Sequence, residues 1–345
     1  MCSTIIFGSN SHKYLAENYD HILDHGLVGV NLKGTVKENG RQPGEKTIRW
    51  YVRYGSITFN QFSLELPVSG MNEKGLAVAL MWHDEGDYGI DERYSRLSAL
   101  QWIQYQLDNY QNIAEVLEGL ETIRPKQEGV PLHYTLLDAR GNSLLLEFLD
   151  GKPQLYENPE YPILTNSSYR SCLEKGKNHV NRTDRVENSS ITRFCHLYRQ
   201  YPELNRSDTN ISIGFDILRS VRQAPTNNNE SFPWNTGGQN NSITAWSIVF
   251  SPSESLISFR THRNESIREI RLSDFDFGEE SDYLVMDIND GTDGNAEQFF
   301  KPYSKECNRN IVRRTAKTFQ MSETEQDNLV NLVDSLYLNR EMRIG

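Results

Sequence analysis

The second residue of the chain carries the side chain best suited to covalent chemistry. Cys2 stands directly before the β-branched run STIIFGS, and loss of the initiator methionine would leave it with a free α-amine beside its thiol. A thiol with an ordinary pKa of about 8.5 is mostly protonated at neutral pH, whereas an α-amine has a pKa of about 7.7–8.0. The amine can accept the thiol proton and return it to a leaving group, so one residue can supply both nucleophile and base. We therefore expect Met1 to be removed in the mature protein.

Taken alone, a cysteine after methionine is a weak signal, because a free cysteine usually behaves as a small buried hydrophobe. The other thiols belong to Cys172, Cys195 and Cys307, which show neither CxxC pairing nor zinc-like spacing with histidine. Cys195 directly precedes His196, which makes an internal thiol–imidazole pair a second candidate. Adjacent residues on a helix point to different faces, so this pair is poorly placed to act by itself.

Composition restricts the class of function. The 345 residues are 37% hydrophobic and 24% charged, which is ordinary for a soluble globular protein. The net charge of −11 argues against a nucleic-acid partner. No apolar run approaches the roughly 20 residues of a membrane span, and no basic segment followed by an apolar stretch predicts a signal peptide. We therefore predict a cytoplasmic protein without membrane association.

Strands dominate the predicted secondary structure. The first two predicted strands, residues 3–9 and 14–20, are separated by a polar break and should form a hairpin. The segment 133–148 has the turn signal DARGN at its centre and predicts another hairpin. Further strands are predicted in runs rich in β-branched and aromatic residues: 26–32, 47–62, 70–82, 152–157, 161–166 and 243–262.

Helices are predicted in separate blocks between the strands. One helix face is formed by four apolar or aromatic residues at three- and four-residue steps, Leu100, Ile103, Leu107 and Tyr110. Capping boxes, at Asn112 with Glu115 and at Ser322 with Glu325, predict a second helix and a final helix. Helical patterns also occur around 191–198 and 213–221, and residues 224–242 form a long polar loop of a kind that is often functional. Segregated blocks of this kind predict an α+β fold with antiparallel sheets covered by helices.

Several motifs, taken in order, resemble the choloylglycine hydrolase family, which includes bile salt hydrolases and penicillin V acylases. They run from Cys2 to about Asn264 and comprise MC, ENYD, GMNEKGLAVA, ILTNSS, SSITRF and TAWSIVF followed by ISFRT. The resemblance implies an N-terminal nucleophile (Ntn) hydrolase, a single domain over 1–345 built as a four-layer αββα sandwich. It also implies a bacterial homotetramer, with a candidate oligomerisation arm within 167–241, and a reaction that needs no cofactor or metal.

The resemblance also assigns roles to residues near the thiol. Cys2 would be the nucleophile, and Asp20 would accept a hydrogen bond from its α-amine. Arg193 would favour the thiolate and pair with Asp20. The family usually has an arginine three residues before the aspartate, but this chain has Glu17 there. An ionised carboxylate near Cys2 would raise the thiol pKa, so Glu17 must point away or be offset by a cation such as Arg193.

Further roles concern the oxyanion and the substrate. The side-chain amide of Asn166 would donate to the developing oxyanion, a contact worth about 3–4 kcal/mol of barrier. The backbone N–H of Trp82 would be the second donor, and its indole, with Met81 nearby, would line the acyl pocket.

The resemblance implies hydrolysis of a linear amide C–N bond through a thioester on Cys2. A tryptophan at position 82 resembles the acylases of Gram-negative bacteria, so a penicillin V acylase-like activity on a small-molecule amide is predicted. The alternatives are a conjugated bile salt hydrolase and an N-acyl-homoserine lactone acylase. An alternative from another class is a binding protein that keeps the fold while Glu17 disables the site.

Overall fold

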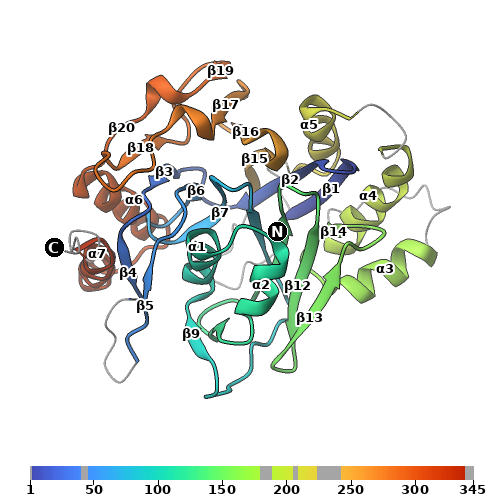
Figure 1. The fold of residues 1–345 in the computed structure, drawn as a ribbon, viewed down its shortest axis with the longest axis horizontal. Coiled ribbons are helices and arrows are strands. Elements are labelled where there is room, and N and C mark those ends of the chain that lie inside the picture. The colour runs from blue at the N-terminus through green and yellow to red at the C-terminus, as the bar shows by residue number, and fades with distance from the viewer. Residues whose placement is uncertain (1, 40–45, 179–188, 205–208, 224–241, 339–345) are drawn as a thin grey trace.

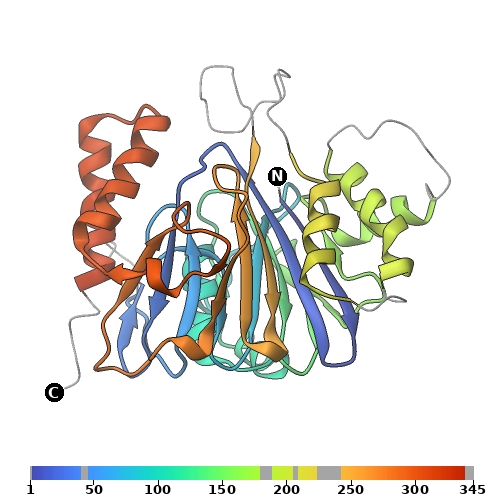
Figure 2. The ribbon, with the colours of Figure 1, turned by 90° about the horizontal axis from the view of Figure 1, so that it is seen from above.

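The computed structural model describes residues 2–39, 46–178, 189–204, 209–223 and 242–338. Met1 and residues 224–241 of the predicted long loop lie outside these ranges, as does part of the predicted oligomerisation arm. Within the described residues, two large and mainly antiparallel sheets pack against each other, and helices flank them (Figures 1 and 2). The predicted α+β class is therefore confirmed.

The first sheet carries the N-terminal strand, β1, beside its edge strand β14. Its order is β14-β1-β2-β15-β16-β17-β19. The predicted hairpin at the N-terminus is β1 with β2, and the segment predicted at 243–262 forms the hairpin of β15 with β16. The bounds are β14 (Ile163–Leu164), β1 (Ser3–Ser9), β2 (His12–His21), β15 (Ile243–Ser251), β16 (Leu256–Thr261), β17 (Arg268–Arg271) and β19 (Gly294–Asn295).

The second sheet contains the strands before and after the first helix pair. Its order is β13-β12-β11-β8-β7-β6-β3-β18-β20. The hairpin predicted over 133–148 is β11 with β12. The bounds are β13 (Lys152–Glu157), β12 (Ser143–Leu149), β11 (Leu132–Leu137), β8 (Ala77–Trp82), β7 (Pro67–Asn72), β6 (Ser56–Asn60), β3 (Leu27–Asn31), β18 (Leu284–Asp287) and β20 (Lys301–Pro302).

The strand predicted over 47–62 is interrupted. Its first part, β5 (Arg49–Tyr51), pairs with β4 (Val36–Glu38) in a separate ribbon, and only β6 joins the second sheet. The chain leaves the strand direction because the backbone N–H groups of Arg53 and Tyr54 both donate to the carbonyl of Asp108. A second ribbon pairs β9 (Ser95–Leu97) with β10 (Ile123–Pro125).

Helices cover the outer faces of the sheets. Helix α1 packs on β7 of the second sheet, whereas α4 and α5 pack on β1, β2 and β15 of the first. Helices α6 and α7 form a hairpin at the opposite end from α3–α5 (Figure 2). The bounds are α1 (Ala99–Asn109), α2 (Ile113–Gly119), α3 (Tyr169–Asn178), α4 (Ser190–Leu204), α5 (Ile211–Ser220), α6 (Lys305–Thr318) and α7 (Glu323–Leu338), with short 3₁₀ turns η1 (Pro252–Glu254), η2 (Leu272–Asp274) and η3 (Glu297–Phe299).

The capping box predicted at Ser322 is present, and at Asn112 the N-cap is present while the Glu115 carboxylate accepts from the N–H of Gln111 instead. The side chain of Asn112 accepts from the backbone N–H of Glu115, at 3.1 Å. The hydroxyl of Ser322 accepts from the N–H of Glu325, whose carboxylate accepts from the N–H of Ser322 at 2.8 Å. These contacts satisfy N–H groups that the first turn of a helix leaves unpaired.

Polar contacts tie the two sheets together near the start of β1. The hydroxyl of Thr4 lies 2.7 Å from that of Thr135 on β11 and donates to the sulfur of Met81 on β8. These contacts fix the N-terminal strand against β8 and β11 of the other sheet.

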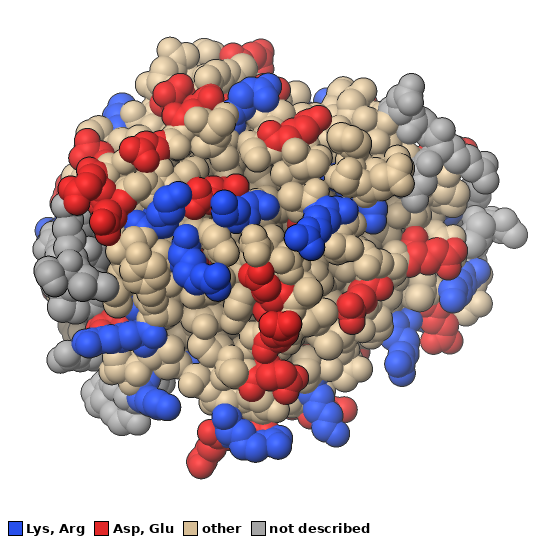
Figure 3. All heavy atoms as spheres, in the orientation of Figure 1, with Lys and Arg blue, Asp and Glu red and all other residues tan. Residues whose placement is uncertain are grey.

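The surface carries charges of both signs. Acidic and basic side chains are interspersed on the face seen in Figure 3. Such a mixed surface produces no extended field of one sign on that face. Among the described helices, every one is too short or too polar for a membrane span.

A buried ion pair anchors the ribbon of β4 and β5 to α1. The ammonium of Lys37 lies 3.1 Å from the carboxylate of Asp108, and both side chains are almost fully buried. The indole N–H of Trp50 donates to the same carboxylate at 2.8 Å. Removing one partner of a buried pair leaves the other charge uncompensated, which usually costs about 3–5 kcal/mol.

The substitution Asp108→Asn should therefore lower the free energy of unfolding by about 3–5 kcal/mol. Urea denaturation of the variant and the unmodified protein, followed by tryptophan fluorescence, measures the difference. A loss below about 1 kcal/mol would show that Lys37 finds another partner or water.

Candidate active site

The pairing of β1 with its two neighbours determines what surrounds Cys2. Thr4 is opposite Leu164 on β14, and Ser3 is opposite Asn18 on β2. Continuing both registers by one or two residues places Cys2 beside Asn166 and Tyr19. The Cys2 side chain is 4% exposed, and its sulfur lies 3.9 Å from the carbonyl oxygen of Asp20.

The side chain of Asn166 makes three hydrogen bonds at this point. Its Oδ1 accepts from the backbone nitrogen of Cys2 at 2.9 Å and from Nη2 of Arg193 at 2.7 Å. Its Nδ2 donates to the carbonyl of Trp82 at 2.8 Å. An amide NH₂ has two hydrogens, and the second has no hydrogen-bond acceptor among the described residues. That hydrogen can donate to a substrate oxygen.

Asp20 and Arg193 form the charged part of the site. Nη1 of Arg193 lies 3.6 Å from Oδ2 of Asp20, and both side chains are buried. The hydroxyl of Thr244 donates to Oδ1 of Asp20 at 2.5 Å. Burial raises the pKa of Asp20 to about 6, against the opposing effects of Arg193 and Thr244. The contact described for the Cys2 nitrogen is with Asn166, so the predicted bond from the α-amine to Asp20 stays a prediction.

The thiol of Cys2 cannot ionise easily by itself. Burial raises its pKa to about 11, and the charge of Asp20 acts in the same direction, as does that of Glu17 at pH values where Glu17 is ionised. A thiol of this kind needs a base within reach to become a nucleophile. In a chain that has lost Met1, the α-amine of Cys2 itself would be that base.

A cavity of about 820 Å³ opens beside the thiol. Trp82 lines it, and Met81 does not. Successive side chains of a strand point to opposite faces, and the Met81 sulfur accepts from Thr4 between the sheets. The lining is mostly apolar and includes Phe62, Leu66, Val68, Leu80, Leu100, Val130, Leu132, Phe319, Met321, Leu329 and Leu332, with Asp20, Asn39, Lys126, Glu128 and Glu325 among its polar groups.

The end of α6 and the helix α7 form one wall of this cavity through Phe319, Met321, Leu329 and Leu332. The sequence interpretation missed this wall. The only available signal was the set of apolar residues in the predicted final helix, and nothing local indicates what such a face packs against.

Glu17 lies in the space between the sheets. It is opposite Thr4 in the β1–β2 pairing, it is fully buried, and it does not line the cavity. Neither carboxyl oxygen has a hydrogen bond of normal geometry to a described residue. Burial raises the pKa of Glu17 to about 8, although the nearby hydroxyl of Ser69 acts in the opposite direction. Glu17 is therefore protonated at neutral pH and adds no negative charge beside Cys2, while Arg193 is paired with Asp20 and Asn166.

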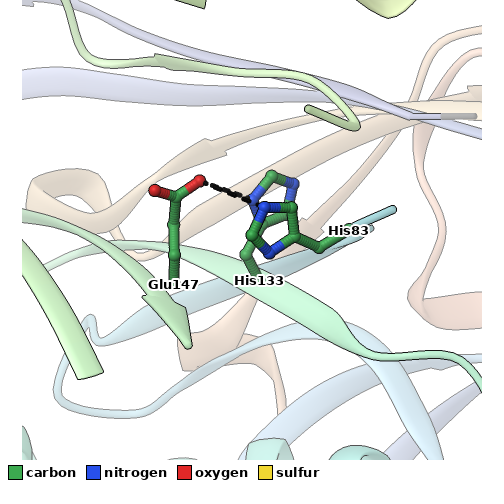
Figure 4. Close-up of side chains that lie close together, drawn as sticks. All are labelled: His83, His133 and Glu147. Atoms are coloured by element: carbon green, nitrogen blue, oxygen red, sulfur yellow. Dashed lines mark hydrogen bonds and ion pairs between the residues drawn. The ribbon is translucent and has the colours of Figure 1, made fainter. Parts of the chain in front are cut away.

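One cluster of described residues has the composition of a metal-ligand set. His83, His133 and Glu147 offer nitrogen and oxygen atoms that lie within 4.8 Å of one another (Figure 4). The two imidazole rings are stacked, with centroids 4.4 Å apart and planes at 7°. Their nitrogen lone pairs therefore lie in parallel planes and do not converge on one point, as tetrahedral coordination requires.

The second thiol candidate is not assembled. Cys195 and His196 both lie on α4 outside the cavity, and no hydrogen bond joins these two side chains in the described part of the chain. Nε2 of His196 is instead 2.6 Å from Nε2 of Gln200. Burial raises the pKa of the Cys195 thiol.

Comparison with known proteins agrees with this geometry. Residues 2–191, more than half of the chain, match the sequence profile of the linear amide C-N hydrolases, choloylglycine hydrolase family. The chain belongs to this family. A penicillin V acylase of Pectobacterium atrosepticum is 30% identical over 140 residues, a region that spans 36% of this chain and 37% of that relative. The alignment thus covers little more than a third of the relative's length.

Solved structures extend the likeness of this choloylglycine hydrolase family member to most of its length. A penicillin V acylase from Agrobacterium tumefaciens is 22% identical, covers 88% of this chain and 98% of its own, and superposes with a TM-score of 0.72. The C2A mutant of a conjugated bile acid hydrolase from Clostridium perfringens is 15% identical, with 88% and 97% coverage and a TM-score of 0.69. At these identities the likeness concerns the fold, and the predicted Ntn-hydrolase sandwich is confirmed.

We expect Asn166→Ala to lower kcat by about 10²–10³-fold, because it removes the amide predicted to donate to the substrate oxygen. Asn18→Ala is the matched control. Asn18 is also a buried asparagine of the first sheet, but its side chain bonds Leu218 and Ser247 and does not line the cavity. Steady-state kinetics per folded protein should show the large loss only in the first variant, and equal losses in both would contradict the assignment.

Glu17→Gln should change how stability depends on pH. Glu17 is protonated in the native state up to about pH 8, but in the unfolded chain it ionises near its ordinary pKa of about 4.3. Between these values the native state holds one more proton, so its stability falls by about 1.4 kcal/mol per pH unit. The variant has no ionisable group at position 17 and lacks this pH dependence. Its free energy of unfolding, compared with that of the unmodified protein, should therefore rise steadily from about pH 5 to about pH 8. Urea denaturation at several pH values measures the free energy of unfolding of both proteins. If the two free energies change with pH in parallel, Glu17 is ionised in the native state.

Proposed function

We propose that this protein hydrolyses linear amides of apolar acyl groups by acyl transfer to Cys2, in the manner of a penicillin V acylase. The observation that carries the proposal is the placement of the Cys2 thiol on an apolar cavity beside Asn166. Asn166 in turn contacts Trp82 and Arg193. The family match over residues 2–191 supports the same reaction class.

The proposed reaction begins when the α-amine of Cys2 takes the thiol proton. The thiolate attacks the amide carbonyl carbon, a C–S bond forms, and the oxygen becomes an oxyanion that accepts hydrogen bonds from Asn166 and the Trp82 N–H. The α-ammonium then protonates the departing nitrogen, and the C–N bond breaks to leave a thioester. Water, deprotonated by the same amine, attacks the thioester and releases the carboxylic acid and the free thiol.

The shape and chemistry of the cavity favour the acylase. Its aromatic lining, with Trp82, Phe62 and Phe319, suits a flat aryl ring or an acyl chain. A relative and a solved neighbour are named penicillin V acylases. Conjugated bile salts and acyl-homoserine lactones are the alternative substrates, and a solved neighbour is named a conjugated bile acid hydrolase. A binding protein without activity would require Glu17 to oppose the thiolate, which its protonated state does not do.

The test compares substrates on protein whose intact mass shows that Met1 is absent. We expect kcat/KM for side-chain release from penicillin V to exceed that for glycine release from glycocholate by at least about tenfold, a transition-state difference of about 1.4 kcal/mol. A reversed preference would identify a bile salt hydrolase. The binding protein would be favoured by two results together. The protein would cleave none of penicillin V, glycocholate and an acyl-homoserine lactone, and a thiol probe would not label Cys2. Cys2→Ala should abolish hydrolysis, whereas Cys195→Ala should retain it.

Location and assembly are further proposals. All four cysteines, Cys2, Cys172, Cys195 and Cys307, are free thiols, which suits the reducing cytoplasm of a bacterial cell. The main buried core runs from Cys2 to Ala296, and a small second cluster joins Ile311 of α6 to Leu27, Leu64 and Val285, which supports a single domain over 1–345. The homotetramer rests on the family resemblance alone.

A further inference from the structure

The buried cluster of His83, His133 and Glu147 adjoins the residues proposed to bind the oxyanion. His83 directly follows Trp82 along the chain. The pairing of Tyr134 with Leu146 in the β11–β12 hairpin places His133 directly across from Glu147. All three side chains are fully buried, and none lines the cavity (Figure 4). The proposed reaction uses none of them.

The hydrogen bonds of His133 determine its protonation. Nε2 lies 2.5 Å from the carbonyl oxygen of Thr165, which can only accept, so Nε2 carries a hydrogen. Nδ1 lies 3.3 Å from Oε1 of Glu147, and this oxygen already accepts from the N–H of Tyr169 at 2.7 Å. A neutral imidazole with its hydrogen on Nε2 would direct the lone pair of Nδ1 at this acceptor oxygen, and the two would repel each other. Both contacts are satisfied when His133 carries a hydrogen on each nitrogen and is an imidazolium. The alternative, a protonated Glu147 that donates to a neutral His133, is opposed by the lowered pKa of Glu147.

We propose that His133 and Glu147 form a buried imidazolium–carboxylate pair that positions Asn166 and Trp82 for the reaction. This role rests on the proposed function of the site. His133 and Glu147 touch neither the cavity nor Cys2, so both are positioning residues.

The pair acts on Asn166 through the backbone. The imidazolium holds the carbonyl of Thr165, the residue directly before Asn166, and so orients the peptide that joins them. The hydroxyl of Ser190 lies 2.9 Å from the Thr165 hydroxyl and accepts from the N–H of Asn166 at 2.8 Å. Glu147 holds the N–H of Tyr169 at the start of α3. The turn that carries Asn166 is thus fixed on both sides.

The pair also reaches the strand end that carries Trp82. The ring of His83 stacks on that of His133, and the backbone N–H of Asp84 donates to the carbonyl of Asn166 at 3.1 Å. Burial, with the charge of His133, lowers the pKa of His83 to about 3, so His83 stays neutral against the cation. The segments that carry the two proposed oxyanion donors, Asn166 and Trp82, are therefore both held by the His133–Glu147 pair.

Charge balance inside the cluster favours the ionised pair. Burial by itself would raise the pKa of Glu147, but the hydrogen bond and charge of His133 outweigh burial and lower it. The other titratable groups that interact with the pair include His83, Asp84, Tyr156, Tyr169 and Cys172. Two opposite charges that neutralise each other in a buried site are tolerated, whereas one alone is strongly unfavourable.

Three variants test the positioning role: His133→Gln, Glu147→Gln and the double variant. His133→Gln leaves the Glu147 carboxylate without its partner, and Glu147→Gln removes the carboxylate that holds the second hydrogen of His133. We therefore expect kcat to fall about 10–100-fold in each, while KM, set by the separate cavity, changes less than about threefold. The double variant contains no buried charge, and its glutamines can still bond Thr165 and Tyr169. Its kcat should be at least about tenfold higher than that of Glu147→Gln. Such non-additivity is expected only of residues that interact with each other.

Asp108→Asn is the matched control, because it breaks an equally buried pair whose residues do not line the cavity. It should lose stability but keep its kcat per folded protein. Equal losses of kcat in the control and in the single variants, or a double variant as slow as the singles, would overturn the positioning role.

Two measurements do not depend on turnover and so separate this proposal from the proposed function. The ¹⁵N NMR spectrum of labelled histidine should show His133 with both nitrogens protonated between about pH 6 and about pH 8, and with one in Glu147→Gln. The rate at which a thiol probe labels Cys2 should fall in the single variants and recover in the double variant. A neutral His133, or one tightly bound metal ion per chain in the purified protein, would overturn the ion pair even if amide hydrolysis is observed.

Discussion

The side-chain amide of Asn166 is the interaction on which the site depends, because it joins the two sheets where the chain begins. Its oxygen accepts from the Cys2 nitrogen of the first sheet, and its nitrogen donates to Trp82 at the end of a strand of the second. An amide is the one common side-chain group that accepts and donates at adjacent atoms in this way. A carboxylate of the same shape would repel the Trp82 carbonyl, and a hydroxyl is too short to span both partners.

Burial governs the charges around this amide more than any single ion pair does. The same loss of water raises the pKa of Cys2, of Asp20 and of Glu17. Only Asp20 has a buried cation beside it, so it is the carboxyl group best able to keep its charge near neutral pH. Glu17 holds a proton instead. The unusual residue at this position therefore leaves the site with an acid that is neutral when the thiol must ionise.

Local signals explain what the sequence could predict. Hairpins at the N-terminus and at 133–148, and the caps at Asn112 and Ser322, depend on residues a few positions apart, and all are present. The meeting of Cys2 with Asn166 was reached only through a family resemblance, since it depends on the pairing of strands 160 residues apart along the chain. The cavity wall from α6 and α7, and the protonation of Glu17, depend on packing and burial that no short pattern encodes. His83 directly follows Trp82 along the chain, but its neighbours His133 and Glu147 come from other strands.

The alternation of side chains along β8 separates two tasks at the end of one strand. Leu80 and Trp82 face the cavity, whereas Met81 contacts Thr4 between the sheets, and His83 joins His133 there. A change at position 82 can alter which acyl group fits without disturbing the buried polar groups that hold the backbone. Conversely, a change in the buried polar groups can misplace the backbone N–H of Trp82 and the amide of Asn166 while the cavity keeps its shape. Substrate preference and catalytic geometry are therefore set by neighbouring residues of the same strand, yet each can vary independently of the other.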